Sequence, residues 1–110
     1  MANTFKNAFA ENVATSAQTI FTTGGSAQAI LIGLQLTNTT SAEITSTITL
    51  VDNSDSSNAL VLLNAVPIPA NSLVSVFVGD KVVLESSDIL KVHSNTGTAL
   101  NVFASYLEIT

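Results

Sequence analysis

The only histidine of the chain, His93, is the first residue to consider for catalysis, because serine hydroxyls are plentiful and Asp88 precedes it in the same region. In a Ser-His-Asp triad the histidine acts as general base and the aspartate orients it. The α/β-hydrolase form of the triad also has a Gly-x-Ser-x-Gly turn and an oxyanion loop, and this sequence has neither. We therefore expect His93 to be a solvated or interface side chain.

A second group of polar residues lies between Asp52 and Asn58, where carboxylate and amide oxygens follow one another closely. Such oxygens are the ligands that Ca²⁺ prefers. An EF-hand loop that began at Asp52 would require a glycine and a glutamate at the positions that Ser57 and Leu63 occupy. The sequence therefore predicts an ordinary polar loop without a metal or cofactor, and we expect that the protein is not an enzyme.

The composition limits the partners that the protein can have. The chain has 110 residues and a formal net charge of −5, and its three basic residues are all lysines. Nucleic acids and anionic membranes both attract basic surfaces, so we expect neither as a partner. The apolar runs are also too short to span a bilayer. Only 10% of the residues are charged, and a surface poor in charge is weakly protected against association. This composition favours a subunit that partner proteins cover.

Residues 1–17 differ from the remainder of the chain, because they lack glycine and proline and are rich in alanine. Within them Phe5, Phe9 and Val13 recur at a spacing of four residues, which places side chains on one face of a helix. The pattern predicts a short N-terminal arm or helix, with disorder as the alternative. The two phenylalanines then either cover one end of the domain core or pack on a neighbouring subunit. Our candidate partner contacts are Phe5, Phe9 and Val13.

From residue 18 onward, short apolar runs alternate with turn residues, which is typical of β-strands. We predict about eight strands, over residues 18–23, 27–38, 42–51, 59–63, 73–78, 81–84, 89–94 and 99–109. The close spacing of these runs favours an antiparallel sandwich over βαβ units. The predicted fold class is therefore all-β, an antiparallel β-sandwich of jelly-roll or Ig-like type, with one domain over residues 18–110.

Glycine and proline give finer predictions within the strand region. Gly33 interrupts the longest apolar run, so it marks a β-bulge or the close approach of another chain. Pro67 and Pro69 stand at alternate positions, and proline cannot donate a hydrogen bond within a sheet. The segment around them is therefore predicted to be an edge strand or a connection, and to cross from one sheet to the other.

The end of the sequence is predicted to form a hairpin. Residues 89–94 and 99–109 are both apolar runs, and the segment between them contains Gly97. We expect the two runs to pair and to complete a sheet. Tyr106 is two residues from Ala104, on the same predicted strand face, so we expect its ring to be packed rather than free.

Four segments of the chain resemble a known group of proteins: MANTFKNA at residues 1–8, PIPANS at 67–72, GDKVVLESSD at 79–88 and ASYLEIT at 104–110. The chain is similar, over nearly its whole length, to small virion-associated proteins of tailed bacteriophages, in particular marine and cyanobacterial phages. That group often has a glycine where this chain has Ala70-Asn71, and another at the position of Ser87. The resemblance implies a β-sandwich subunit that is present in many copies on a particle.

The resemblance leaves three functions open. The protein is expected to be a capsid decoration or cement protein that binds the major capsid protein and stabilises the phage head. The alternatives are a component of the neck, head-tail joint, tail or fibre, and a module that binds a carbohydrate or host surface. The expected location is the virion. We also expect a homo-oligomer, and three-fold sites on a capsid would favour a trimer.

Overall fold

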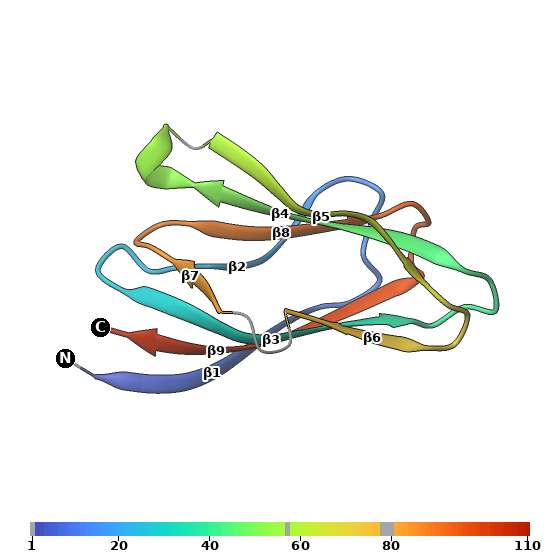
Figure 1. Ribbon diagram of the computed structural model, residues 1–110, viewed down its shortest axis with the longest axis horizontal. Helices are drawn as coiled ribbons and strands as arrows, with labels where there is room; N and C mark the ends of the chain where they lie inside the picture. The colour runs from blue at the N-terminus through green and yellow to red at the C-terminus, as the bar shows by residue number, and fades with distance from the viewer. Residues whose placement is uncertain (1, 57, 78–80) are drawn as a thin grey trace.

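Two antiparallel β-sheets make up almost all of the computed structural model, which describes residues 2–56, 58–77 and 81–110 (Figure 1). The five-stranded sheet contains β1 (Asn3–Ala10), β9 (Leu100–Ile109), β3 (Gln28–Asn38), β6 (Leu73–Val76) and β7 (Val82–Leu84). The four-stranded sheet contains β2 (Gln18–Thr22), β8 (Ile89–Ser94), β4 (Ile44–Asp52) and β5 (Asn58–Ile68). One 3₁₀ turn, η1 (Asn53–Asp55), joins β4 to β5.

The strand pairing has the form of one long hairpin that has been rolled up. β4 pairs with β5 at the closed end, β3 pairs with β6 and β7, β2 pairs with β8, and β1 pairs with β9. The resulting orders are β1-β9-β3-β6 in one sheet and β2-β8-β4-β5 in the other. An Ig-type sandwich keeps its first two strands in one sheet, whereas β1 and β2 lie in different sheets here. The predicted all-β sandwich is confirmed, and its connectivity is that of a jelly roll.

The core lies between the sheets and is filled from both of them. Side chains alternate across each strand, so one face of each sheet is buried. The largest fully buried side chains are Leu31, Leu34, Leu36, Ile44, Ile48, Ile68, Leu84, Leu90, Leu100, Val13, Val92 and Val102. The rings of Phe21 on β2 and Tyr106 on β9 stack at a centroid distance of 4.2 Å and so connect the two sheets. The prediction that Tyr106 is packed is confirmed.

The N-terminal segment is a strand, so the predicted helix in residues 1–17 is wrong. β1 pairs with β9 over its whole length, from Asn3 opposite Ile109 to Ala10 opposite Val102. The error has a simple cause. A spacing of four residues repeats on one face of a helix, but four is also an even number, so it repeats on one face of a strand. Residues 3–10 therefore belong to the same sheet as strands from residues 18–110.

The predicted bulge at Gly33 is confirmed, because the register between β3 and β9 shifts between Leu31 and Gly33. The shift changes which side chains of β3 face the core. Ala29 and Leu31 are buried before it, and Leu34 and Leu36 are buried after it. Strict alternation would place Ile30, Ile32, Leu34 and Leu36 on one face, and that prediction fails for the first two of these residues.

The prolines lie where the sequence predicts an edge and a crossing. Pro67 is part of β5, which forms one edge of the four-stranded sheet, and it lies opposite Thr45. The chain then passes Pro69 and enters β6 in the five-stranded sheet. Asn38 fixes this crossing, because its side-chain amide donates hydrogen bonds to the carbonyl oxygens of Ala42 and Ile68, at 2.7 and 3.1 Å.

The predicted terminal hairpin is wrong, because β8 and β9 lie in different sheets. β8 lies between β2 and β4, and β9 lies between β1 and β3. The connection from Asn95 to Thr98 therefore bridges the two layers instead of joining paired strands. Alternation cannot distinguish these cases, since a strand that covers the core from either sheet has the same pattern of buried and exposed residues.

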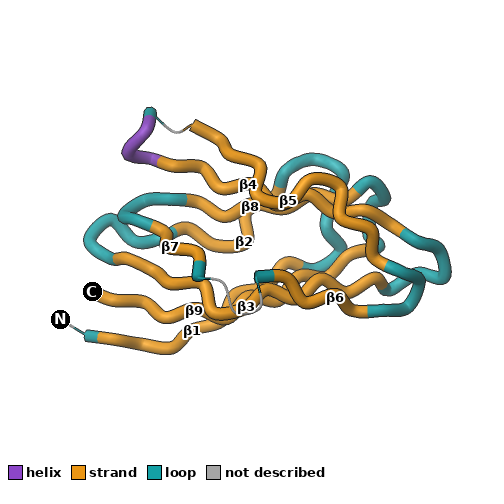
Figure 2. The backbone as a smooth tube through the Cα atoms, in the orientation of Figure 1, coloured by secondary structure: helices purple, strands orange, loops and turns teal. Residues whose placement is uncertain are grey.

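The remaining strand predictions agree closely with the structure, except that the strand predicted over residues 59–63 is β5, which extends to Ile68. The connections gather mainly at the two ends of the sandwich (Figure 2). The strand predicted over residues 73–78 is β6, which ends at Val76. Its last predicted residue, Val78, and the predicted turn at Gly79 and Asp80 lie outside the described residues. In the described part of the chain, no helix has the length and hydropathy needed to cross a membrane.

Candidate functional site

Exposed large apolar side chains gather on the face of the five-stranded sheet that points away from the core. Every strand of that sheet contributes at least one of them: Phe5 and Phe9 on β1, Phe103 on β9, Ile32 on β3, Leu73 on β6 and Val83 on β7. Their exposed fractions run from 41% for Phe103 to 78% for Phe5. We call these six residues the apolar outer face. Large exposed apolar areas are uncommon on monomeric proteins and mark sites of interaction.

The strand register brings the aromatic residues of this face together. Phe9 lies directly opposite Phe103, and Phe103 lies opposite Gln35 on the next strand. Phe5 lies opposite Leu107 in the same way. Residues that oppose each other in antiparallel strands point to the same side of the sheet, with Cβ atoms only about 5 Å apart. The apolar outer face therefore extends across β1, β9 and β3, and the polar pair Asn7–Ser105 lies between its Phe5 and Phe9 rows.

The apolar outer face contains shallow hollows rather than a deep pocket. One of about 230 Å³ lies between Ile32, Gln35, Ser75 and Phe103. Two others, beside Phe9 and beside Phe5, also include Phe103 in their walls. Binding sites for small molecules usually enclose roughly 300–1,000 Å³. The shape of this face therefore fits a broad contact with another protein better than the enclosure of a small ligand.

Three strand rows that cross the apolar outer face contain no charged side chain among the described residues, whereas Glu11, just after β1, lines the hollow beside Phe9. These rows are Phe5–Leu107–Ile30–Val83, Asn7–Ser105–Gly33 and Phe9–Phe103–Gln35–Ser75. Lys6 is on the opposite side of β1, where its ammonium group lies 2.9 Å from the Glu108 carboxylate. The hydrogen bond from Lys6 to that carboxylate raises the pKa of the lysine above 10.5. The Lys6 ammonium group therefore keeps its charge at neutral pH and loses it only in strongly alkaline solution.

The three residues predicted as partner contacts do not form one surface. Phe5 and Phe9 are exposed, so the prediction that they cover the end of the core is wrong. Val13 is fully buried, so it cannot contact a partner. Its backbone N–H donates to the carbonyl oxygen of Leu100 at 2.9 Å, which fixes the turn after β1 to the start of β9. Two of the three residues therefore remain candidates for partner contact.

His93 and Asp88, the two residues considered for a catalytic triad, lie in different environments. His93 is half-buried on β8, on the strand face opposite the buried Val92 and Ser94. Asp88 is 2% exposed, and its two carboxylate oxygens accept hydrogen bonds from the backbone N–H groups of Asn53 and Glu85, both at 2.9 Å. The carboxylate therefore connects the β4–β5 turn to the β7–β8 turn. This gives Asp88 a structural task.

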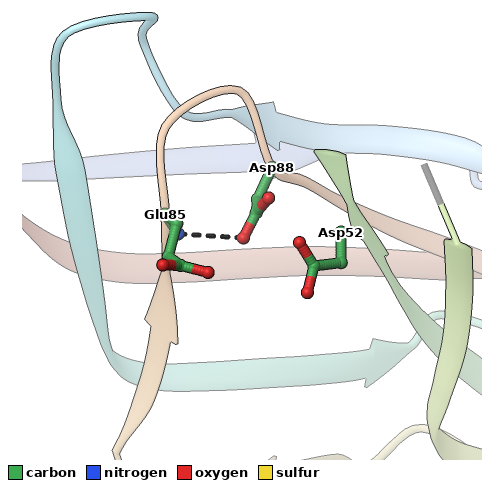
Figure 3. Close-up of side chains that lie close together, drawn as sticks. All are labelled: Asp52, Glu85 and Asp88. Carbon is green, nitrogen blue, oxygen red and sulfur yellow. Dashed lines mark hydrogen bonds between the residues drawn. The ribbon is translucent and has the colours of Figure 1, made fainter. Parts of the chain in front are cut away.

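Three acidic side chains meet at the same place (Figure 3). Oxygen atoms of Asp52, Glu85 and Asp88 lie within 4.8 Å of one another. Asp52 also accepts hydrogen bonds from the backbone and the hydroxyl of Ser54, at 3.1 and 2.7 Å, and so caps η1. The hydrogen bonds of Asp52 and Asp88 hold the β4–β5 and β7–β8 turns in place.

The chain matches no protein-family model, and it matches none of the curated proteins. The functional reading therefore depends on the residues themselves.

Sequence reasoning missed Phe103, Ile32, Leu73 and Val83 as members of an exposed face. Three of these residues lie in strand runs that looked like core sequence, and Phe103 alternates with Val102 and Ala104, which are buried. One signal was present in the sequence. Large apolar residues stand on both faces of residues 99–109 and 27–38, which indicates a sheet that is covered on both sides.

Proposed function

We propose that this protein is a non-enzymatic structural protein of a tailed-bacteriophage virion, a capsid decoration or cement protein that binds the head and stabilises it. The observation that carries the proposal is the apolar outer face, which is broad, uncharged and exposed. Water contact with this face is unfavourable, at about 25 cal/mol for each Å² of apolar surface. A subunit that docks through it onto another protein removes that cost.

The resemblance of residues 1–8, 67–72, 79–88 and 104–110 to virion-associated proteins of tailed phages supports a partner within the virion. In this proposal the partner is the major capsid protein, and the apolar outer face is the docking surface. The jelly roll agrees with this role, because it recurs in viral capsid domains, although the same fold serves other functions.

The proposed mechanism is stabilisation by mass action. A subunit that binds only the assembled shell lowers the free energy of the shell, by an amount that grows with the subunit concentration relative to its dissociation constant. A subunit that contacts two capsid proteins also links them, and many such sites on one lattice act together. No catalytic group is needed.

A position in the neck, head-tail joint, tail or fibre is the second candidate. An uncharged docking face serves a ring of subunits as well as it serves a shell, and the copy number per virion separates the two.

A carbohydrate-binding module is the third candidate function. Such sites usually present an aromatic platform, and the single tyrosine, Tyr106, is instead stacked on Phe21. The exposed phenylalanines keep this third candidate testable by binding to a glycan array.

A reconstitution experiment with matched variants tests the docking face. Phage particles stripped of the protein are incubated with the wild type, with Phe103→Ser and with Leu60→Ser, and the bound protein is measured after sedimentation. Leu60 is 56% exposed on β5, in the other sheet, so its replacement removes a comparable exposed apolar group away from the proposed contact. We expect Phe103→Ser to bind at least tenfold more weakly and Leu60→Ser to bind like the wild type.

Two results would contradict the proposal. Equal binding of the Phe103→Ser and wild-type proteins would remove the apolar outer face as the docking surface. Absence of the protein from purified virions, measured by quantitative gel densitometry, would remove the virion role itself. Among positive results, hundreds of copies per virion indicate decoration of the head, and about a dozen or fewer indicate a ring at the neck or tail.

A further inference from the structure

The outer edge of β1 is open and presents hydrogen-bonding groups to the surroundings. β1 ends the strand order of its sheet, with β9 as its neighbour (Figure 1). Ala2 and Thr110 exchange two backbone hydrogen bonds of 2.9 Å, so they form a hydrogen-bonded pair. Such pairs alternate along an antiparallel ladder. The even-numbered residues of β1 therefore bond to β9, and Phe5, Asn7 and Phe9 direct their N–H and C=O groups away from the sheet.

This edge has little of the protection that sheet edges usually have. Natural edges carry prolines, bulges, very short strands or charged side chains, lysine in particular. β1 is 8 residues long, pairs with β9 without a register shift, and contains neither proline nor glycine. Its one charged residue is Lys6, which is paired with Glu108. β5, an edge of the other sheet, contains Pro67 and two register shifts.

We propose that β1 pairs in antiparallel fashion with β1 of a second copy of this chain, so that two five-stranded sheets join into one across a twofold axis at Asn7. Charge does not oppose a second copy at this edge. The chain has a net charge of −5, which opposes self-association in general, but β1 contains no acidic residue. Two copies can therefore meet along β1 without placing carboxylates against each other.

The position of the proposed twofold axis follows from which side chains of β1 it would set opposite one another. With the axis at Asn7, Phe5 of each copy lies opposite Phe9 of the other, and Lys6 lies opposite Ala8. Aromatic pairs at opposed positions stabilise a sheet. With the axis at Lys6, the two lysines would oppose each other, at a Cα separation of about 4.5 Å, and like charges there are destabilising. The axis at Asn7 therefore pairs both phenylalanines of the edge and sets no like charges directly opposite each other.

This contact does not rest on the proposed function. It uses the backbone edge of β1, whereas docking uses the side chains of the apolar outer face, and the joined sheet presents that face continuously from both copies. A contact of an edge with itself is isologous and closes as a dimer. A trimer would require a different surface on each side of every contact.

Crosslinking tests the pairing directly, because the chain has no cysteine of its own. The variants Asn7→Cys and Ser105→Cys are oxidised under mild conditions and examined on non-reducing gels. Asn7 lies at the proposed axis, where opposed Cα atoms are about 5.5 Å apart, a separation that a disulfide can bridge. Ser105 lies opposite Asn7 on β9, on the same face of the sheet but one strand further in.

The expected result is a covalent dimer for Asn7→Cys and none for Ser105→Cys. Crosslinking of both variants would overturn the edge contact in favour of packing of the two outer faces. A wild type that remains monomeric in sedimentation equilibrium across the micromolar to millimolar range would also overturn it, as would a trimer. None of these results depends on binding to a virion, so the edge contact can fail while the proposed function stands.

Asn7→Pro gives a second test that preserves the fold. The N–H of Asn7 points to the open edge, so proline there removes no bond to β9, and edge strands tolerate proline in this orientation. We expect the dissociation constant of the dimer to rise about tenfold or more, since one backbone hydrogen bond is lost on each side of the axis. Asn7→Thr, which keeps the N–H, is the control. An unchanged dimer in Asn7→Pro, with the wild-type circular dichroism spectrum, would refute edge pairing.

Charged pairs test the position of the axis. In the double variant Phe5→Lys/Phe9→Lys the proposed axis sets like charges opposite each other, and the dimer should dissociate. In Phe5→Lys/Phe9→Glu the same axis sets opposite charges together, and the dimer should form again. A dimer that is equally stable in both variants would show that the axis does not lie at Asn7.

Discussion

Phe9 and Phe103 lie directly opposite each other on neighbouring antiparallel strands, and both side chains are exposed to solvent. Replacing both by serine should therefore change the free energy of unfolding by no more than about 1 kcal/mol, because exposed side chains contribute little. The same change should lower the binding of a hydrophobic dye to the native protein. Leu60→Ser is the control and should leave more of the dye binding intact. Dye fluorescence and urea denaturation measure the two effects.

Truncation to alanine should lower the free energy of unfolding much more at Val13 than at Phe5. Val13 is fully buried, so Val13→Ala should cost about 1.5–3 kcal/mol through lost burial and the cavity that remains. Phe5 is 78% exposed, so Phe5→Ala should change stability by about 0.5 kcal/mol or less. Chemical denaturation of the two variants measures the difference. Equal losses would mean that β1 packs more closely than the structure shows.

Ser87→Gly should stabilise the protein. Ser87 has a φ of 66°, and its N–H bonds to the carbonyl of Thr23 in the turn before β8. This conformation costs a residue other than glycine about 1–2 kcal/mol, so glycine relieves that strain. Glycine also has more conformational freedom in the unfolded chain, which lowers the stability by about 0.4–1 kcal/mol and offsets part of the gain. We expect a net gain of about 0.5 kcal/mol, or a rise in Tm of roughly 2–4 °C.

The neighbouring residue supplies the control for this change. Ser86 donates its hydroxyl to the carbonyl of Gly25 at 2.6 Å and has no positive φ. Ser86→Gly should therefore lower Tm. If both variants lowered Tm, the backbone strain assigned to Ser87 would be absent.

Asp88→Ala should be among the most damaging polar substitutions. Its carboxylate is buried and accepts hydrogen bonds from the N–H groups of Asn53 and Glu85. Its removal leaves both groups without a partner, which should cost about 2–4 kcal/mol. Glu43→Ala removes the same unit of charge from an exposed turn and should cost almost nothing. Equal effects in urea denaturation would indicate that net charge, rather than these hydrogen bonds, determines the result.

Thr23→Val should stabilise the protein by about 0.5–1.5 kcal/mol. The Thr23 hydroxyl is buried and has no hydrogen-bond partner within the described residues. Valine has nearly the same shape and needs no partner. Thr22→Val makes the same change at the adjacent exposed position and should have a smaller effect. The midpoints of thermal unfolding compare the two, and a loss of stability in Thr23→Val would mean that the hydroxyl is satisfied by water.

Strand positions could be predicted from the sequence, because alternation and turn residues are local signals. Pro67 on the edge strand β5 and the bulge before Gly33 were both predictable in this way. Which strands pair could not be predicted. β8 and β9 are neighbours in sequence and both cover the core, yet they belong to different sheets. That choice depends on β1 and β2, which are distant in sequence.

The candidate site was predicted only in part, because exposure depends on which face of a sheet points inward. Phe5 and Phe9 were named as candidate partner contacts through a helical spacing that a strand satisfies equally well, and the structure exposes both. Phe103 was not identified, since an apolar residue in a strand normally indicates the core and the apolar residues on both faces of 99–109 were its only signal. It appears exposed only when the register places it beside Phe9 on the outer side.

The pairing of β1 with β9 determines when the protein can finish folding. These are the first and last strands of the described chain, and they lie side by side. At about 5–20 residues per second, the roughly 90 residues between them take on the order of 5–20 s to be synthesised. During that interval the ribosome holds a chain whose first strand has emerged before its partner exists. The five-stranded sheet is therefore completed only after translation has passed residue 109, and the nascent edge must stay soluble until then.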